Sequence, residues 1–209
     1  MAKPEARVPI RSNARSNRAK ILAAACELLG QNPDATLEEI AQAAGVVRRT
    51  VHGHFPGRVA LLEALAEEAS EALRAASARW PDGTEEPEHA FAGFVLAVWP
   101  EGDRYRLLLS LAAQNLGQER VTEAVAPARA AALAILERGR RAGVFHDRLP
   151  APALSAAREA YTLGLLEAVT AGLWEGTGAR AAVASLIAVG VPVERAERVV
   201  AEVVATGRE

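Results

Sequence analysis

Cysteine is almost absent from this chain of 209 residues, which contains only Cys26, and aromatic residues make up 4% of it. A single cysteine excludes an intrachain disulfide and any zinc or iron–sulfur site built from cysteines. No segment approaches the roughly 18 consecutive apolar residues of a membrane span, and the polar, basic start lacks the apolar run of a signal peptide. We therefore expect a cytoplasmic protein with no membrane association, no cofactor and no metal site.

The sequence patterns of common enzymes are missing as well. The four histidines, His52, His54, His89 and His146, form no H-E-x-x-H motif, and the chain has neither a phosphate-binding loop nor G-x-G-x-x-G. Cys26 falls within a helical pattern rather than beside a base. These absences argue against an enzyme, and we predict no catalytic residue.

Charge is divided unevenly along the chain, although the formal net charge is only −2. Residues 1–58 carry nine basic and five acidic side chains, a net charge of +4, whereas the remainder carries fifteen basic and twenty-one acidic side chains, a net charge of −6. A basic head on an acidic body suggests that the head meets a polyanion. A solvated basic tail is the alternative explanation.

The apolar residues recur every three or four positions and alanine and leucine dominate, which predicts an all-α fold. The T-x-x-E pattern of Thr36 and Glu39 predicts a capping box at the start of a helix. The predicted helices cover 16–29, 36–43, 46–54, 58–78, 87–99, 103–116, 120–142, 152–174 and 178–206, the last with a bend at 190–192. We accordingly divide the chain into a flexible basic arm (1–15), a three-helix head (16–58) and an all-helical body (59–209).

Residues 37–54 have the spacing of a helix-turn-helix. Ala41 is small enough for a second helix to cross closely, and Gly45 can adopt the left-handed conformation of a tight turn. Ile40, Val46 and Val51 would join the two helices, which leaves one face of the second helix exposed toward a DNA major groove. The residues on or near that face are Val47, Arg48, Arg49, Thr50, His52 and Gly53. A small helical hairpin without nucleic acid is the alternative.

Further residues extend this pattern: I-L-x-A-A at 21–25, T-L-E-E-I-A-Q-A-A-G-V at 36–46, R-R-T-V-H-G-H-F-P at 48–56, and a basic residue followed by A-L-L within 58–62. Together they resemble the tetracycline-repressor (TetR) family of bacterial transcription regulators, from about residue 18 to residue 65. The resemblance implies a DNA-binding head, a divergent helical body that often binds a small molecule, and a homodimer built on the last two long helices.

Position by position, the resemblance implies a phosphate contact for Thr36 and a similar one for Arg58, which stands where a lysine is usual. His52 replaces the usual tyrosine, and Gly53 replaces a larger residue, through either close approach to DNA or drift. His54 either ends the helix by packing or lies near a phosphate. The predicted DNA-binding set is Thr36, Val47, Arg48, Arg49, Thr50, His52, Gly53, His54 and Arg58.

In the body, aromatic residues fall on helices that surround the effector pocket in this family, and such pockets are mostly apolar with few polar groups. The predicted pocket residues are Phe91, Phe94, Trp99, Tyr105, Gln114 and Tyr161. Packing of the aromatics in an ordinary core is the alternative.

A line of small residues on the helix predicted from Pro152 would allow close packing against a second copy, with an intramolecular core as the alternative. A dimer would place two heads on successive major grooves and read a palindromic operator. We thus expect a DNA-binding regulator, specifically a repressor released by a small-molecule effector. The alternative is a TetR-like regulator whose body senses a protein partner or no ligand.

Overall fold

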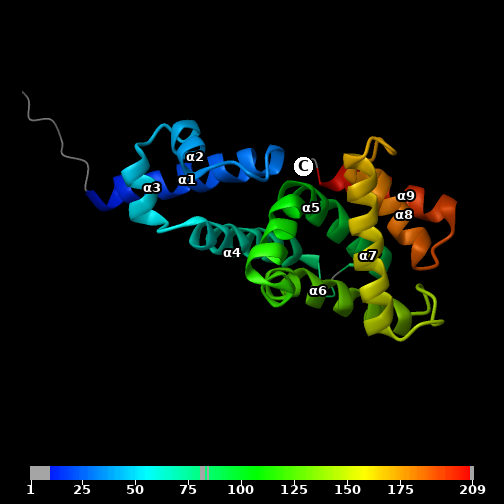
Figure 1. Ribbon diagram of the computed structural model, residues 1–209. Helices are drawn as coiled ribbons and strands as arrows, with labels where there is room; N and C mark the ends of the chain where they lie inside the picture. Colours follow the sequence, from blue (N-terminus) through cyan, green and yellow to red (C-terminus); the bar gives the residue numbers. More distant parts are fainter. Residues whose placement is uncertain (1–9, 81–82, 84, 208–209) are drawn as a thin grey trace, which may run out of the picture. The chain divides into compact units, whose positions relative to one another are not determined.

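The computed structural model describes residues 10–80, 83 and 85–207, and within them every regular element is an α-helix (Figure 1). In chain order the helices are α1 (Ile10–Gln31), α2 (Leu37–Ala43), α3 (Arg48–His54), α4 (Arg58–Ser77), α5 (Pro87–Leu116), α6 (Gln118–Arg141), α7 (Ala151–Thr170), α8 (Gly178–Ala188) and α9 (Val193–Thr206). The prediction of an all-α fold is confirmed.

The chain divides into two compact units. The first contains residues 1–67 together with 107–120, and the second contains residues 68–106 together with 121–209. The helices α4, α5 and α6 each contribute to both units. The predicted head (16–58) thus lies within the first unit, which also includes the first turns of α4 and the end of α5.

The first unit packs α1, α2 and α3 around one apolar core. Periodic apolar residues of α1 are buried because they recur on one face, and the start of α4 adds leucines to the same unit. Phe55, directly after α3, is 2% exposed. The buried apolar side chains of this part include Ile21, Leu22, Ala25, Leu29, Ile40, Ala41, Val51, Leu61 and Leu62.

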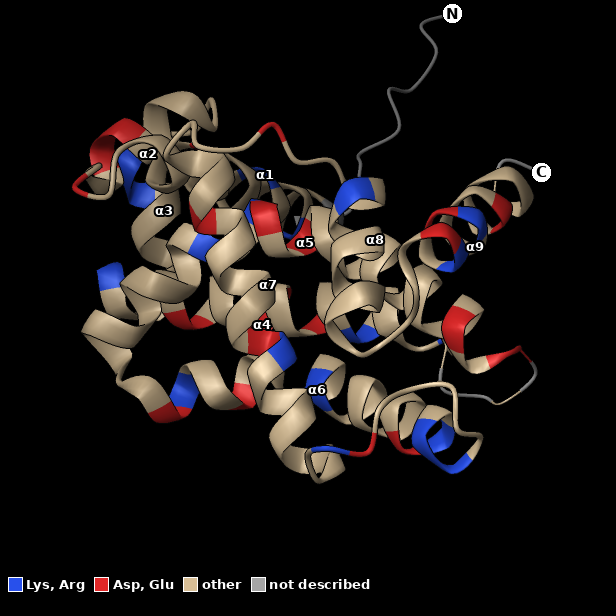
Figure 2. Ribbon diagram, turned by 90° about the vertical axis from the view of Figure 1, so that its right-hand side faces the viewer, with Lys and Arg blue, Asp and Glu red and all other residues tan. Residues whose placement is uncertain are grey.

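The second unit has its own core, contributed by α5 to α9 and the later part of α4. The helix α7 packs on α8, and α8 packs on α9. Glu88 in the first turn of α5 forms an ion pair with Arg195 of α9, and Nε2 of His89 lies 2.8 Å from Oε2 of Glu202. Figure 2 shows the charged residues of α9 as neighbouring bands of opposite sign.

Three predicted boundaries differ clearly from the structure, one of them at the end of the helix predicted over 152–174, which stops at Thr170. The helix α1 begins at Ile10, so residues 10–15 of the predicted flexible arm are helical, whereas residues 1–9 lie outside the described part. No proline or glycine separates Ile10 from Gly30, and arginine and alanine in this stretch favour a helix.

The predicted break between 99 and 103 is also wrong, because α5 runs through Pro100 without interruption. Proline removes one backbone hydrogen bond from a helix. Burial of Phe94, Val95 and Trp99 before it and of Tyr105 after it holds the helix together on both sides. At the other end of the chain, the predicted bend at 190–192 is confirmed as the link between α8 and α9.

In the part of the chain that the structure describes, no helix combines the length and the apolar character needed to cross a bilayer. The same residues contain no group of three His, Cys, Asp or Glu side chains placed to hold a metal ion.

Candidate nucleic-acid interface

The turn between α2 and α3 has the geometry of a helix-turn-helix. Gly45 adopts φ +66°, a left-handed conformation that is unfavourable for residues with a Cβ atom. The N–H of Val46 donates to the carbonyl oxygen of Ala41 at 3.0 Å, which closes the end of α2. Ile40 and Val51 are both 0% exposed and join the two helices. The turn therefore fixes the direction in which α3 leaves α2.

The predicted capping box at the start of α2 is present. The Thr36 hydroxyl accepts from the N–H of Glu39 at 3.2 Å and donates to Glu39 Oε2 at 2.8 Å, while the Thr36 N–H donates to the same carboxylate at 2.7 Å. The pKa of Glu39 is lowered, most by the hydrogen bond from the Thr36 N–H and next by the one from the Thr36 hydroxyl. Thr36 is exposed, so its first role in this structure is to set the start of α2.

One face of α3 is left to solvent. Val47, the N-cap residue, is 69% exposed although it is apolar. Arg48, Arg49, His52 and Gly53 are exposed as well. Val51 is buried on the opposite side of α3, so the core holds the helix while two arginines and the His52 imidazole face solvent. Of the remaining predicted residues, Thr50 and His54 are half-buried.

The two arginines of α3 differ in their surroundings. Arg48 forms an exposed ion pair with Glu38 of α2, at 3.2 Å between Nη1 and Oε2, and its Nε donates to Nε2 of His52 at 3.4 Å. Arg49 forms no ion pair with any other described residue. An exposed ion pair contributes little stability, so an incoming phosphate or base can replace Glu38 at low cost.

Arg58 forms two hydrogen bonds to backbone carbonyls that sequence reasoning did not predict. Its Nη1 donates to the carbonyl oxygen of Ala35 at 2.8 Å, and its Nη2 donates to the carbonyl oxygen of Pro33. The first residue of α4 is thereby tied to the loop between α1 and α2. A guanidinium has five N–H donors, so these bonds leave capacity for a phosphate. The sequence contains no pattern that links a basic residue to carbonyls more than twenty positions away.

Four of the six predicted pocket residues are buried: Phe91, Phe94, Trp99 and Tyr105. Phe91 and Phe94 are 0% exposed, and their rings stack with centroids 6.5 Å apart. Trp99 meets Trp174 edge to face at 6.2 Å. These aromatics belong to the core of the second unit or pack against it, and a ligand contact for them stays a prediction.

Tyr105, Tyr161 and Gln114 differ in their surroundings. Tyr105 is 1% exposed, and its hydroxyl donates to Glu68 at 3.3 Å. Tyr161 is 41% exposed, and Gln114 is exposed and belongs to the first unit. Helical spacing of aromatics fails to separate a core from a cavity because both require inward-facing apolar side chains.

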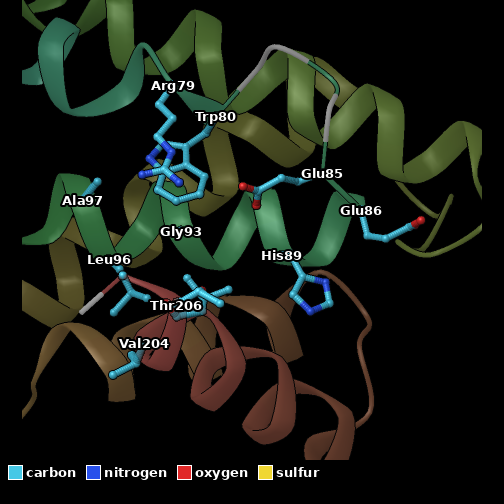
Figure 3. A pocket seen from close by; sticks show the side chains of 12 residues that line it. Arg79, Trp80, Glu85, Glu86, His89, Gly93, Leu96, Ala97, Val204 and Thr206 are labelled. Carbon is cyan, nitrogen blue, oxygen red and sulfur yellow. Dashed lines mark hydrogen bonds between the residues drawn. The ribbon is translucent and has the colours of Figure 1, made fainter. Parts of the chain in front are cut away.

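A groove of about 730 Å³ lies elsewhere in the second unit, between α5, the end of α9 and the segment after α4 (Figure 3). Trp80 forms one wall, with the Arg79 guanidinium 4.9 Å from the centre of its ring. The ring packs so closely on Gly93 that a Cβ there would lie 2.1 Å from it. His89 and Thr206 add polar groups to the rim. None of the six predicted pocket residues lines this groove.

The small residues of α7 divide into exposed and buried positions. Ala156, Ala157, Ala160 and Gly164 are exposed, which leaves a narrow apolar face on the second unit. In contrast, apolar residues of α8 and α9 are partly internal. Leu186, Val199 and Val200 are buried in the core of their own unit.

Comparison with known proteins agrees with these features. Residues 21–65 match the family model described as bacterial regulatory proteins of the tetR family. The HTH-type transcriptional repressor LfrR of Mycolicibacterium smegmatis is 46% identical over 71 residues, which are 34% of this chain and 38% of that protein. The aligned part thus spans well under half the length of this relative.

Solved structures extend the likeness to most of the chain. The TetR-like transcriptional regulator LfrR from Mycobacterium smegmatis, in complex with proflavine, superposes with a TM-score of 0.69 and 25% identity, covering 85% of this chain and 96% of that one. The transcriptional regulator FadR from Bacillus subtilis, in complex with stearoyl-CoA, gives a TM-score of 0.68 at 15% identity, with 83% and 98% coverage, and shows the shared fold. The family-model match of residues 21–65 and the likeness of the fold to LfrR agree with each other: in its head and in its fold the chain is similar to bacterial regulatory proteins of the TetR family.

Proposed function

We propose that this protein is a sequence-specific DNA-binding repressor that acts in the cytoplasm as a homodimer and has no catalytic activity. The observation that carries the proposal is the outward face of α3, where Arg48 and Arg49 are exposed above the buried Val51. Arginine binds guanine edges through two parallel hydrogen bonds and also binds phosphate. The left-handed turn at Gly45 fixes the direction in which α3 leaves α2, as in helix-turn-helix proteins that insert their second helix into a major groove, and this supports the proposal.

The DNA-binding set divides by its surroundings into two roles. Arg48, Arg49 and His52 are exposed on α3 and are proposed to contact bases and nearby phosphates, with Val47 and Gly53 close to the DNA surface. The remaining four, Thr36, Thr50, His54 and Arg58, are proposed to contact phosphate from the edges of the same surface. Thr36 and Arg58 would do so while they hold the ends of the loop between α1 and α2.

The homodimer is proposed to form through the exposed small residues of α7, which permit close approach of a second copy. Two heads related by a two-fold axis would recognise half-sites one helical turn apart, about 34–36 Å, and therefore an inverted repeat. A small-molecule effector bound to the second unit would favour a dimer whose heads no longer fit successive grooves, and operator affinity would fall.

One observation favours the alternative in which the body senses a protein partner or no ligand. The aromatics expected to line a pocket are packed into the core, and the groove beside Trp80 has different residues. A titration of the protein–operator complex with proflavine and with a set of small organic acids distinguishes the two. Release of DNA by any of them supports an effector-responsive repressor.

The experiment that tests the proposed function is a selection of genomic DNA fragments with the purified protein, followed by gel shifts on the enriched sequence. We expect an inverted repeat, and a half-site deletion should lower affinity far more than a deletion outside the repeat. Enrichment of no sequence by folded protein would contradict the proposal. An asymmetric site would contradict the dimeric arrangement alone.

A further inference from the structure

A buried arginine in the second unit has no partner for its charge. Arg158 of α7 is only 7% exposed, yet it forms no ion pair and its Nε has no hydrogen-bond acceptor among the described residues. Its guanidinium lies over the ring of Phe94 from α5, with the central carbon 5.4 Å from the ring centre. A buried unpaired cation is costly, and most buried charges in proteins are paired.

A second unpartnered donor lies one turn earlier on the same helix. Ser155 is 3% exposed, and its hydroxyl has no hydrogen-bond partner. Residues three apart on an α-helix share a face, so the hydroxyl and the guanidinium lie on the same side of α7. Arginine has no acceptor to offer the serine, and both groups require an oxygen from another molecule or segment.

The charge around this position is positive. Arg129 of α6 binds Glu159 of α7 through two hydrogen bonds of 2.8 Å, so the adjacent carboxylate is shared and Arg158 forms no ion pair of its own, although the charge of Glu159 still favours its charged form. Burial lowers the pKa of Arg158 to about 10, so the guanidinium is still charged at neutral pH. The cluster of Arg129, Arg158 and Glu159 therefore has a net charge of +1.

Exposure increases from the core toward the surface along this cluster. Arg158 is 7% exposed, whereas the side chains of Glu159 and Arg129 are 25% and 38% exposed. The aromatic rings of Phe94 and Phe91 lie at the inner end. A ligand that reaches Arg158 between α6 and α7 would meet a cation, a hydroxyl and an apolar interior. We propose that Arg158 and Ser155 form the anchor for a monoanionic organic acid, whose carboxylate binds both donors.

This inference names the class of effector for the proposed function and rests on that function only for the effect on DNA. Binding of the acid is a separate property of the second unit. Charge-assisted hydrogen bonds have net values that correspond to about 10- to 100-fold in affinity, so loss of the guanidinium should be readily measurable. The site is distinct from the groove beside Trp80, which Arg158 does not line.

The test uses three probes with the same rings and different charge: 2-naphthoate, 2-naphthamide and 2-naphthamidine, titrated calorimetrically into the full chain. We expect naphthoate to bind at least about tenfold more tightly than the amide, and the cationic amidine to bind more weakly than either. Tightest binding by the amidine, or equal binding of all three, would overturn the proposal.

The variant Arg158→Met should lose about 10- to 100-fold in naphthoate affinity and leave amide binding unchanged. Arg148→Met, at an exposed position of the same unit, should bind naphthoate like the wild type. Without ligand, Arg158→Met should melt at the same temperature as the wild type or higher, because replacing a buried unpaired charge with an apolar side chain removes a desolvation cost. A lower melting temperature with unchanged naphthoate affinity would assign Arg158 a structural role and refute the inference.

Ser155→Ala provides a second test that does not disturb the charge, and it should reduce naphthoate affinity several-fold with little effect on melting. A parallel gel shift with the operator separates the two proposals. If DNA binding is intact and no probe binds, the acid-binding inference fails and the repressor stands. If naphthoate binds without changing operator affinity, the site stands and its role as effector site fails.

Discussion

Replacing Gly53 with alanine adds one methyl group to α3, and its effect on stability can be measured separately from its effect on DNA binding. Gly53 lies near the end of α3 on the exposed face, and a Cβ added there meets no atom within 4 Å. Alanine is favoured over glycine in a helix by about 0.5–1 kcal/mol, because glycine loses more backbone freedom on folding. Gly53→Ala should therefore stabilise the first unit by up to this amount.

Urea unfolding followed by far-UV circular dichroism measures this gain. With a slope of about 2 kcal/mol per molar urea, the midpoint should rise by roughly 0.3–0.5 M. All three tryptophans belong to the second unit, so their fluorescence follows the unfolding of that unit and serves as a reference that the substitution should not change. Gly45→Ala makes the same chemical change at φ +66° and should destabilise by about 1–2 kcal/mol. A lower urea midpoint for Gly53→Ala would contradict the observation that the backbone at this residue is helical and has space for a Cβ atom.

The same variant decides why a glycine occupies this position. If the backbone of α3 approaches DNA closely at Gly53, the added methyl group should lower operator affinity at least tenfold while the head becomes more stable. If the glycine arose by drift, affinity should stay within twofold of the wild type. Gel shifts at one fixed salt concentration distinguish the two outcomes, since protein–DNA affinity depends strongly on salt.

Three further predictions concern the second unit. Gly139→Ala would place a Cβ 2.1 Å from the ring of Phe145, and we expect a loss of about 1–3 kcal/mol by urea unfolding; unchanged stability would contradict the tight packing seen there. Gly164→Arg places a long charged side chain on the exposed face of α7 and should convert a dimer to a monomer in analytical ultracentrifugation, with an unchanged circular dichroism spectrum; a persistent dimer would exclude this face as the interface. The hydrogen bond from Arg129 lowers the pKa of Glu159 below 4.5, so its stabilisation is complete above that pH and is lost as pH falls through the lowered value. The difference in stability between wild type and Glu159→Gln should therefore shrink from pH 6 toward pH 3, and a constant difference would contradict the ion pair.

The head was largely predictable from sequence because local rules determine it. The capping box at Thr36 and the left-handed turn at Gly45 each depend on residues within a few positions, and both are present. The link from Arg58 to the carbonyls of Pro33 and Ala35 was not predictable, since it depends on how α4 returns to a distant loop.

The body was predictable only as a set of helices. The sequence could not distinguish the exposed small residues of α7 from the buried valines of α9, because an apolar helical face looks the same whether it meets its own chain or a partner. Likewise, the break predicted between 99 and 103 is absent, because burial on both sides of Pro100 keeps α5 continuous. The unpartnered state of Arg158 depends on which helices surround it, and no spacing in the sequence indicates it.

The central claim, that the exposed face of α3 reads DNA, is tested most directly by measuring operator affinity across a salt series for wild type, Arg49→Ala and the body control Arg148→Ala. We expect log affinity to fall linearly with log salt for all three, and Arg49→Ala alone to bind the operator more weakly and to lose preference for it over a scrambled duplex. Equal affinity and equal preference for wild type and Arg49→Ala, with both proteins folded, would contradict the claim.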